Sequence, residues 1–271
     1  MMKYTLGFLG AGNMAEAIAK AAMERGIVPA AQMIASDPSQ ARRDVFAAMG
    51  IAVTTSNEEV ISQSSQVMLA VKPQMMANVY GDLAKHGSQD QVILSIVTGI
   101  TIAKMNATVV AAGGKTMRVI RIMPNTPIMV SQGMAGIAAG VDCHPGDDEL
   151  AMKLFSAGGK AIQVEESLID AITVVSGSGP AYLFYLAQAM EEAATKLGLG
   201  EHARLLVAQT LKGASELLMQ SPDTPAELRR KVTSPGGTTE AAIKHMEANR
   251  VMAVIVEAIE AAEKRSKELG K

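Results

Sequence analysis

The sequence predicts an α/β protein, in which a doubly wound, mainly parallel sheet is followed by a set of long helices. Short apolar runs rich in Val and Ile alternate with helix-like segments through the first half of the 271 residues, which is the pattern of a parallel sheet covered on both faces. A glycine-rich turn follows the first run, and no strand signal recurs after Glu166. We therefore expect two domains, 1–163 and 164–271.

The expected elements follow from these patterns in chain order. Apolar runs predict strands at 5–9, 32–36, 51–54, 67–71, 92–97 and 119–123. Apolar residues at helical spacing predict helices at 180–197, 201–219, 241–246 and 250–269. Residues 180–190 are apolar all round, so this helix needs burial on several sides, more than so small a helical domain offers. A homodimer that interleaves these helices would supply it.

Composition argues against several functional classes. The net charge is -2, from 25 basic and 27 acidic residues that are well mixed, so we expect neither nucleic acid nor an anionic membrane as a partner. Residues 122–141 and 171–190 are charge-free and long enough to span a membrane, but their internal Pro, Gly and polar residues argue against it. The single cysteine, Cys143, and the lack of a secretion signal favour the cytoplasm. The scattered histidines predict no metal site.

A dinucleotide-binding motif follows the first predicted strand. The segment Gly10-Ala11-Gly12-Asn13-Met14-Ala15 leads into a helix-like run and has the Gly-x-Gly-x-x-Ala pattern of Rossmann-like folds. Gly10 allows the tight turn, Gly12 lets a pyrophosphate approach the backbone, and Ala15 keeps helix and strand close. The motif is short, and its position ahead of the alternating pattern is what makes it informative.

Polar residues also follow the other predicted strands, at the edge where ligands of such sheets bind. These strand ends carry Ser36-Asp37, Lys72 within 70–74, Thr98-Gly99 and Asn125 within 121–127. Asp37 is spaced to accept hydrogen bonds from ribose hydroxyls, which points to NADH, whereas Arg42 and Arg43 could bind the 2′-phosphate of NADPH or simply cover a solvated helix face. Asn125 either contacts the nicotinamide side of the pocket or forms part of a structural turn.

The most informative segment is 232–243, Val-Thr-Ser-Pro-Gly-Gly-Thr-Thr-Glu-Ala-Ala-Ile. Two glycines and several hydroxyl residues stand directly before an apolar-periodic run, which predicts a loop that opens a helix. The free backbone N–H groups and the positive end of the helix dipole favour a small carboxylate or a phosphate there. The competing interpretation is an ordinary turn with ordinary helix caps.

Taken together, these motifs closely resemble those of the pyrroline-5-carboxylate reductase family. The resemblance spans nearly the whole chain and rests on segments 10–14, 70–73, 123–127, 176–182 and 225–243, of which the last is the most specific. It implies an N-terminal dinucleotide-binding domain, a C-terminal helical domain that dimerises, and a substrate site between domains of the dimer. It also implies larger assemblies, often pentamers of dimers.

The resemblance assigns roles to individual residues. Cofactor contacts are implied for Leu9, Gly10, Ala11, Gly12, Asn13, Met14, Ser36, Asp37, Asn57, Ala70, Val71, Lys72 and Pro73, with Thr98 as a further candidate. Substrate contacts are implied for Glu165, Gly237, Thr238 and Thr239. Asp37 stands where many members carry a hydroxyl that helps to bind the 2′-phosphate, so the choice between NADPH, which the family usually prefers, and NADH stays open. No cofactor role is carried over to Lys231.

The implied reaction is the last step of proline biosynthesis, in which 1-pyrroline-5-carboxylate receives a hydride from NAD(P)H and becomes L-proline. An iminium is electrophilic enough to need no strong general acid, so catalysis can rest on positioning and on exclusion of water. We expect the amides of Gly237, Thr238 and Thr239 to hold the carboxylate. The Thr239 hydroxyl would bond the ring nitrogen as the catalytic group, and Glu165 would stabilise its positive charge.

Three other functions compete with this one. A 3-hydroxyacid dehydrogenase-like enzyme would need a lysine about one helical turn after a glycine-rich motif in the second domain, and no lysine occurs between Lys160 and Lys196. Another imine reductase would use much of the same machinery. A non-catalytic dinucleotide sensor would need only the first domain and would leave 232–239 unexplained.

Overall fold

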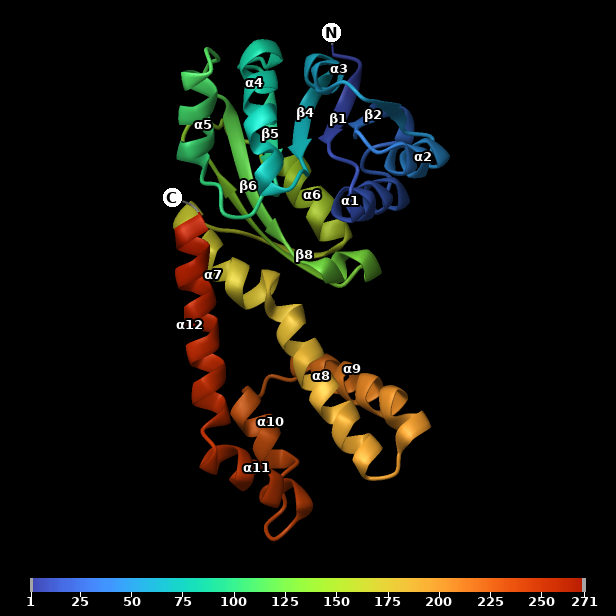
Figure 1. Cartoon of the computed structure of the whole chain (residues 1–271), viewed down its shortest axis with the longest axis vertical. Helices are drawn as coiled ribbons and strands as arrows, with labels where there is room; N and C mark the ends of the chain where they lie inside the picture. The colour runs from blue at the N-terminus through green and yellow to red at the C-terminus, as the bar shows by residue number, and fades with distance from the viewer. Residues whose placement is uncertain (1, 270–271) are drawn as a thin grey trace. The chain divides into compact units, whose positions relative to one another are not determined.

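Residues 2–269, which the computed structural model describes, form one sheet with helices on both faces and a further set of helices (Figure 1). They belong to two compact units. Unit 1 runs to Ser178 and resumes at Glu263, and unit 2 is Gly179–Ala262. The predicted fold class, a Rossmann-like sheet followed by an all-helical domain, is confirmed.

The sheet of unit 1 has the strand order β3-β2-β1-β4-β5-β6-β7-β8. All neighbouring strands are parallel except β6 and β7, which are antiparallel. The strands are β1 (Tyr4–Leu9), β2 (Met33–Ser36), β3 (Ala52–Thr54), β4 (Ser64–Leu69), β5 (Val92–Ser95), β6 (Arg118–Pro124), β7 (Gly133–Ala139) and β8 (Gly159–Gln163). The chain reverses its direction of travel across the sheet between β1 and β4, which is where sheets of this kind bind ligands.

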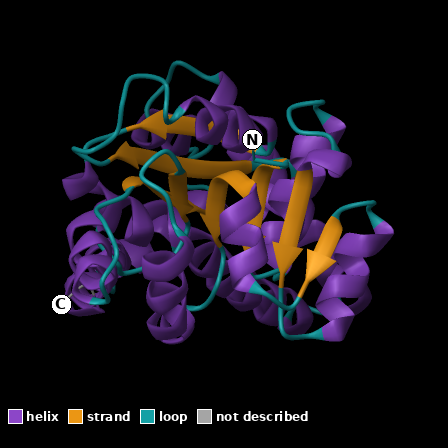
Figure 2. Ribbon diagram, turned by 90° about the horizontal axis from the view of Figure 1, so that it is seen from above, coloured by secondary structure: helices purple, strands orange, loops and turns teal. Residues whose placement is uncertain are grey.

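Helices cover both faces of the sheet (Figure 2). One face carries α1 (Asn13–Glu24), α2 (Gln40–Ala48) and α6 (Glu149–Ala157), and the other carries α3 (Asn57–Gln63), α4 (Met76–His86) and α5 (Ile102–Ala111). Side chains of β4 alternate between the two layers: Met68 packs on the first face, and Val67 and Leu69 on the second. This alternation is the two-residue period of a strand that is buried on both sides.

The sequence did not predict strands β7 and β8. Strand β7, Gly-Met-Ala-Gly-Ile-Ala-Ala, contains a single β-branched residue, and β8, Gly-Lys-Ala-Ile-Gln, also contains only one, so neither has the Val and Ile content that marks the other strands. Glycine lets the two strands start close together, since a Cβ on Gly159 would lie 2.0 Å from the carbonyl oxygen of Gly133. Tertiary pairing, of β7 with β6 and of β8 with β7, therefore overrides weak local preference.

Residues 164–178 pack within unit 1 and form η4 (Glu166–Leu168), α7 (Ile169–Ile172) and a π-helical turn, η5 (Thr173–Gly177). Arg121 of β6 is only 4% exposed and holds this segment: its Nη1 lies 3.3 Å from Glu166 Oε1 and its Nη2 lies 3.0 Å from Asp170 Oδ1. Ser266, near the chain end, donates to the same Asp170 oxygen at 3.2 Å. The compact units therefore divide after Ser178, later than the predicted division at 163.

Unit 2 is helical. Its helices are α8 (Gly179–Lys196), α9 (Ala203–Gln220), α10 (Pro225–Lys231), α11 (Thr238–Ala248) and the first part of α12 (Val251–Leu269). Helix α10 was not predicted as a separate helix, although Thr224 and Glu227 form a capping box: Thr224 Oγ1 accepts from the Glu227 N–H, and Glu227 Oε2 accepts from the Thr224 N–H. Among the described helices, none is long and apolar enough to cross a membrane.

Candidate active site

The glycine turn after β1 leaves a helix start open. Gly10 has φ +95°, and a Cβ there would lie 2.8 Å from the carbonyl oxygen of Ala70, so the turn requires glycine. Gly12 is the N-cap of α1, no side chain caps the helix, and a Cβ on Gly12 would meet nothing within 4 Å. Ala15 is 1% exposed and packs in the core. The first amides of α1 are therefore available to an anion.

Strand register brings the predicted cofactor residues to one edge of the sheet. Leu9 pairs with Ser36 of β2 and with Leu69 of β4, so the residues that follow these three strands are neighbours. A pocket of about 450 Å³ opens there. It is lined by Gly10, Gly12, Ser36, Asp37, Pro38, Thr55, Asn57, Ala70, Val71, Lys72, Met75, Asn78 and Val79.

Ser36 and Asn57, in the wall of this pocket, belong to a hydrogen-bonded chain. The Ser36 hydroxyl donates to Asn57 Oδ1 at 2.6 Å, and Asn57 Nδ2 donates to Asp82 Oδ2 at 2.8 Å. The Asn57 side chain is thereby oriented by groups on both sides. Ser36 itself is only 2% exposed.

The two arginines of the β2–α2 turn have internal partners. Arg42 Nε donates to the Ala11 carbonyl oxygen at 2.6 Å, and its Nη2 donates to Glu16 Oε2 at 2.7 Å. Arg43 donates from Nη1 to the Asp37 carbonyl oxygen and from Nη2 to Gln40 Oε1, both at 2.5 Å. Hydrogen bonds from Lys20 and Arg42 hold the pKa of Glu16 below its ordinary value. Both arginines therefore stabilise the turn, in addition to lying on helix α2.

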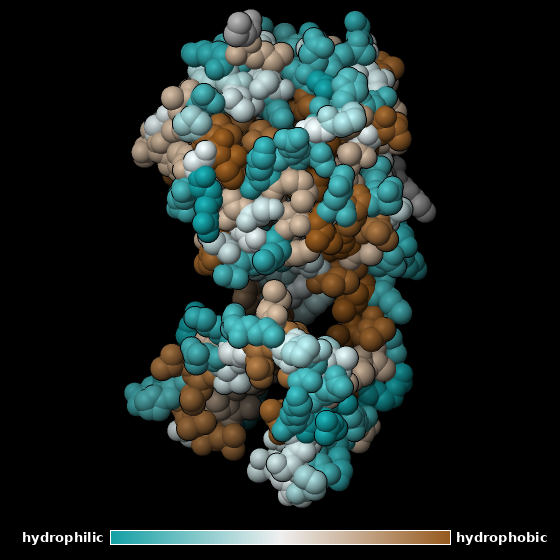
Figure 3. All heavy atoms as spheres, turned by 180° about the vertical axis from the view of Figure 1, so that it is seen from behind, coloured by the Kyte–Doolittle hydropathy of each residue, from teal (hydrophilic) through white to brown (hydrophobic). Residues whose placement is uncertain are grey.

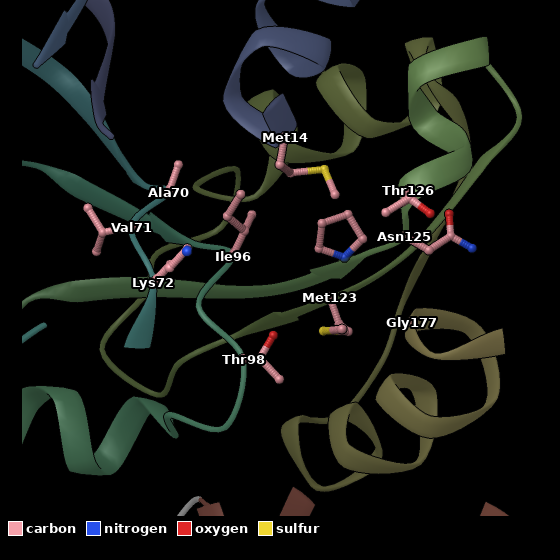
Figure 4. A pocket seen from close by; sticks show the side chains of 11 residues that line it. Met14, Ala70, Val71, Lys72, Ile96, Thr98, Met123, Asn125, Thr126 and Gly177 are labelled. Carbon is pink, nitrogen blue, oxygen red and sulfur yellow. The ribbon is translucent and has the colours of Figure 1, made fainter. Parts of the chain in front are cut away.

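A second pocket, of about 290 Å³, lies beside the first at the ends of β4, β5 and β6. Figure 4 shows Lys72, Thr98 and the thioether of Met14 around it. It shares Ala70, Val71 and Lys72 with the first pocket. Lys72 caps the start of a short 3-10 helix with Pro73 at its first position, so the chain turns sharply after β4.

Asn125 lines this pocket and also has a structural role in its wall, as one of the two interpretations of the sequence expected. Its Nδ2 donates to the carbonyl oxygen and to the hydroxyl of Ser176, at 3.1 and 3.2 Å, and its Oδ1 accepts from the Met134 N–H at 2.8 Å. The amide is thus bonded at both ends within the protein. Gly177, which follows Ser176, lines the same pocket.

The loop before α11 lies in unit 2 and has the predicted form. Gly237 is the N-cap of α11, and no side chain caps the helix. The Gly237 N–H donates to the Ser234 carbonyl oxygen at 3.0 Å and so closes a turn. This differs from the sequence prediction, in which the Gly237 amide was free to hold a carboxylate. The Gly236 N–H donates to Glu240 Oε2 at 2.8 Å, and this bond lowers the pKa of Glu240. Within the described residues, the backbone amides of Thr238 and Thr239 are left without such a partner.

Glu165 lies in unit 1, as the exposed residue that precedes η4. Thr238 and Thr239 lie in unit 2, so the structure describes the two parts of the predicted substrate site separately. In unit 1 most of the predicted cofactor residues line these two pockets, whereas Leu9, Ala11, Asn13 and Pro73 belong to neither lining.

Several pocket residues were not singled out by the sequence analysis. Thr55, Met75, Asn78, Ile96, Thr126 and Gly177 line the two pockets. Thr55 and Ile96 directly follow strands β3 and β5, whereas Met75, Asn78, Thr126 and Gly177 lie in helical segments. Gly177 had a signal, since it belongs to the Gly/Ser-rich segment 176–179. A group of metal-ligating side chains is absent from the described part of the chain. Burial raises the pKa of the Cys143 thiol, consistent with an incidental cysteine.

Comparisons with known proteins agree with this architecture. The model of a family described as pyrroline-5-carboxylate reductase dimerisation matches residues 166–269. A second family model, described as NADP oxidoreductase coenzyme F420-dependent, matches residues 5–99. One family model thus matches the part of the chain that holds the first five strands, and the other matches the helical part after residue 165.

Curated relatives and solved structures share the whole length of the chain. A pyrroline-5-carboxylate reductase of Pseudomonas aeruginosa is 45% identical over 97% of this chain and 96% of its own, and one of Methanosarcina acetivorans is 37% identical over 100% of both. A reductase structure from Coxiella burnetii has a TM-score of 0.88 at 34% identity and covers 99% of both chains. One from Plasmodium falciparum, described with NADP bound, has a TM-score of 0.89 at 27% identity and covers 100% of both. The chain therefore belongs to the pyrroline-5-carboxylate reductase family.

Proposed function

We propose that this protein reduces 1-pyrroline-5-carboxylate to L-proline with NADPH or NADH, the last step of proline biosynthesis. One observation carries the proposal: a chain similar over 97% of its length to a pyrroline-5-carboxylate reductase has two uncapped helix starts, at α1 and at α11. The first start suits the phosphates of a dinucleotide and the second suits a small carboxylate. The imine needs both a hydride donor and a carboxylate anchor.

The residues after β1, β2 and β4 fit a nicotinamide dinucleotide. Gly12 leaves its surroundings open, and the first amides of α1 provide an anion site for the pyrophosphate. When bound, NAD(P)H supplies the hydride. Leu9, Gly10, Ala11, Gly12, Asn13 and Met14 hold the pyrophosphate, Ser36, Asp37 and Asn57 contact the adenosine half, and Ala70, Val71, Lys72, Pro73 and Thr98 contact the remainder.

The loop before α11 binds the substrate. The Thr238 and Thr239 amides hold the carboxylate at the positive end of the helix dipole, and Gly237 allows close approach. The Thr239 hydroxyl hydrogen-bonds the ring nitrogen, which gains one proton while the imine carbon gains the hydride. Glu165 stabilises the positive charge on that nitrogen. Catalysis then rests on orientation and on exclusion of water rather than on a strong acid.

The chain acts as a homodimer in this proposal, and pentamers of dimers are the larger assembly. Four successive apolar residues of α8, Leu183, Phe184, Tyr185 and Leu186, are 44–79% exposed, and apolar side chains gather on the surface of the helical region (Figure 3). An exposed apolar surface of this kind favours association. We place the enzyme in the cytoplasm and expect no nucleic-acid partner. Equilibrium sedimentation that finds only monomers at micromolar concentration would contradict the dimer.

Steady-state kinetics test the function. The purified protein should oxidise NAD(P)H only when 1-pyrroline-5-carboxylate is added, with proline formed in equal amount. Thr239→Ala should lower kcat/KM by about tenfold or more, as expected for a lost hydrogen bond to a charged group. Thr239→Ser restores the hydroxyl and serves as the matched control. A Thr239→Ala enzyme that stays within about twofold of the parent would remove the assigned role.

A further inference from the structure

The Asp37 carboxylate is fixed at the end of β2 by two backbone amides. Its Oδ2 accepts from the Ala11 N–H at 2.9 Å, and its Oδ1 accepts from the Ser39 N–H at 2.8 Å. Asp37 is partly buried and lines the 450 Å³ pocket beside the glycine turn. The carboxylate therefore has a defined position and orientation before any ligand arrives.

This position leaves Asp37 able to accept further hydrogen bonds. Each carboxylate oxygen has about two acceptor sites, and each oxygen of Asp37 uses one of them for a backbone amide. The 2′- and 3′-hydroxyls of an unmodified ribose are both donors. A diol at this point can therefore donate to a carboxylate that is already held in place, with little side-chain entropy to lose.

Asp37 disfavours a 2′-phosphate at the same position. The phosphate carries a charge of about −1.5 to −2 at neutral pH and would face the Asp37 carboxylate. The lining of this pocket contains one basic residue among the described residues, Lys72, which follows β4 and also lines the second pocket. Neither Arg42 nor Arg43 belongs to the lining.

Both arginine side chains of the β2–α2 turn already bond protein acceptors. Arg42 joins the Ala11 carbonyl to Glu16, and Arg43 joins the Asp37 carbonyl to Gln40. The Ser36 hydroxyl donates its proton to Asn57. A 2′-phosphate that drew either guanidinium group into the pocket would break these bonds, which costs part of its binding free energy.

Building on the proposed use of NAD(P)H, we propose that Asp37 is a specificity-determining residue that makes this enzyme bind NADH more tightly than NADPH. Asp37 acts through direct acceptance of the ribose hydroxyls and through repulsion of the 2′-phosphate. Its bond to Ala11 also stabilises the glycine turn, so its replacement weakens NADH binding as well as relaxing the discrimination.

Direct binding to the full-length protein tests the proposal without any turnover. Dissociation constants for NADH and NADPH are measured by titration calorimetry for the parent, Asp37→Ser and Asp37→Asn. Asp44→Ser is the matched control, because Asp44 is an exposed carboxylate on α2 outside the pocket lining, and its loss changes the net charge equally. Circular dichroism reports whether each variant is folded.

The parent should bind NADH at least about tenfold more tightly than NADPH, and Asp37→Ser should reduce this ratio by about tenfold while Asp44→Ser leaves it within about twofold. Equal or tighter binding of NADPH by the parent would overturn the proposal, and so would an unchanged ratio in both folded Asp37 variants. The parent ratio is decisive even if a variant does not fold. A parent protein that binds neither cofactor overturns the proposed function together with this proposal.

Discussion

The side-chain amide of Asn125 bonds the main-chain carbonyl of Ser176 at 3.1 Å and the Ser176 hydroxyl at 3.2 Å. Ser176 belongs to the π-helical turn of unit 1, and such turns recur at functional sites. The contact fixes the next residue, Gly177, in the wall of the 290 Å³ pocket. The loop after β6 thus positions a segment that lies about fifty residues later in the chain.

Replacing Asn125 with Ala should destabilise this pocket wall. The substitution leaves the Met134 N–H and the Ser176 carbonyl without their partner, at a cost of about 1–3 kcal/mol in the free energy of unfolding. We expect the KM for NAD(P)H to rise with it. Chemical denaturation and kinetics measure both. Ser176→Ala removes only the hydroxyl and should cost less, and an Asn125→Ala protein as stable as the parent would contradict the role.

Replacing Gly177 with Ala should narrow the same pocket. A Cβ on Gly177 would lie 2.4 Å from Cε of Met123, a residue that also lines the pocket. The flexible methionine end can move, so stability should change little while the KM for the cofactor rises about threefold or more. The control is Gly179→Ala, since a Cβ there meets nothing within 4 Å. Trimming the methionine, as in Gly177→Ala with Met123→Ala, should restore the cofactor KM.

Arg121→Met should destabilise unit 1. Arg121 is 4% exposed and bonds Glu166 and Asp170, whose side chains are 31% and 23% exposed. Because these carboxylates retain some water, we expect a loss of roughly 2–3 kcal/mol, at or below the range for a broken buried pair. Arg121→Lys keeps the charge but cannot bridge both carboxylates, so its free energy of unfolding should lie between those of the parent and of Arg121→Met. Urea denaturation gives the values, and an unchanged midpoint would count against the role of this ion-pair cluster.

Glu16→Gln should make the free energy of unfolding depend less steeply on pH in the acid range. Lys20 and Arg42 lower the pKa of Glu16 from its ordinary value of 4.5. A carboxyl group with a lowered pKa stabilises the fold above its unfolded pKa, and this contribution is lost as the pH falls through the folded pKa. From pH 6 to pH 3 the parent should therefore lose more free energy of unfolding than Glu16→Gln. Arg42→Met should reproduce part of the effect, whereas parallel curves for the parent and Glu16→Gln would exclude it.

The first six strands and the long helices could be predicted from the sequence because their own apolar residues indicate burial. Val67, Met68 and Leu69, for example, are all 0% exposed in β4, and a run of this kind is apolar whatever its neighbours do. Strands β7 and β8 depend on partners instead. Gly136 of β7 is opposite Met123 of β6, and no local sequence pattern predicts that pairing.

The candidate site was predictable where backbone geometry demands a residue type. Gly10 and Gly236 are such positions, with φ +95° at Gly10 and +72° at Gly236. Roles that depend on hydrogen-bond partners were not predictable. The sequence could not tell that the Gly237 amide closes a turn, or that the Asn125 side chain bonds Ser176.

Transfer of deuterium tests the central claim most directly. The protein is incubated with 1-pyrroline-5-carboxylate and with NADH or NADPH that carries deuterium at its transferable C4 position, and the product is analysed by NMR and mass spectrometry. The account predicts proline with a single deuterium at the δ carbon, formed in step with cofactor oxidation. Cofactor oxidation that yields no labelled proline, or no oxidation with either cofactor, would contradict it.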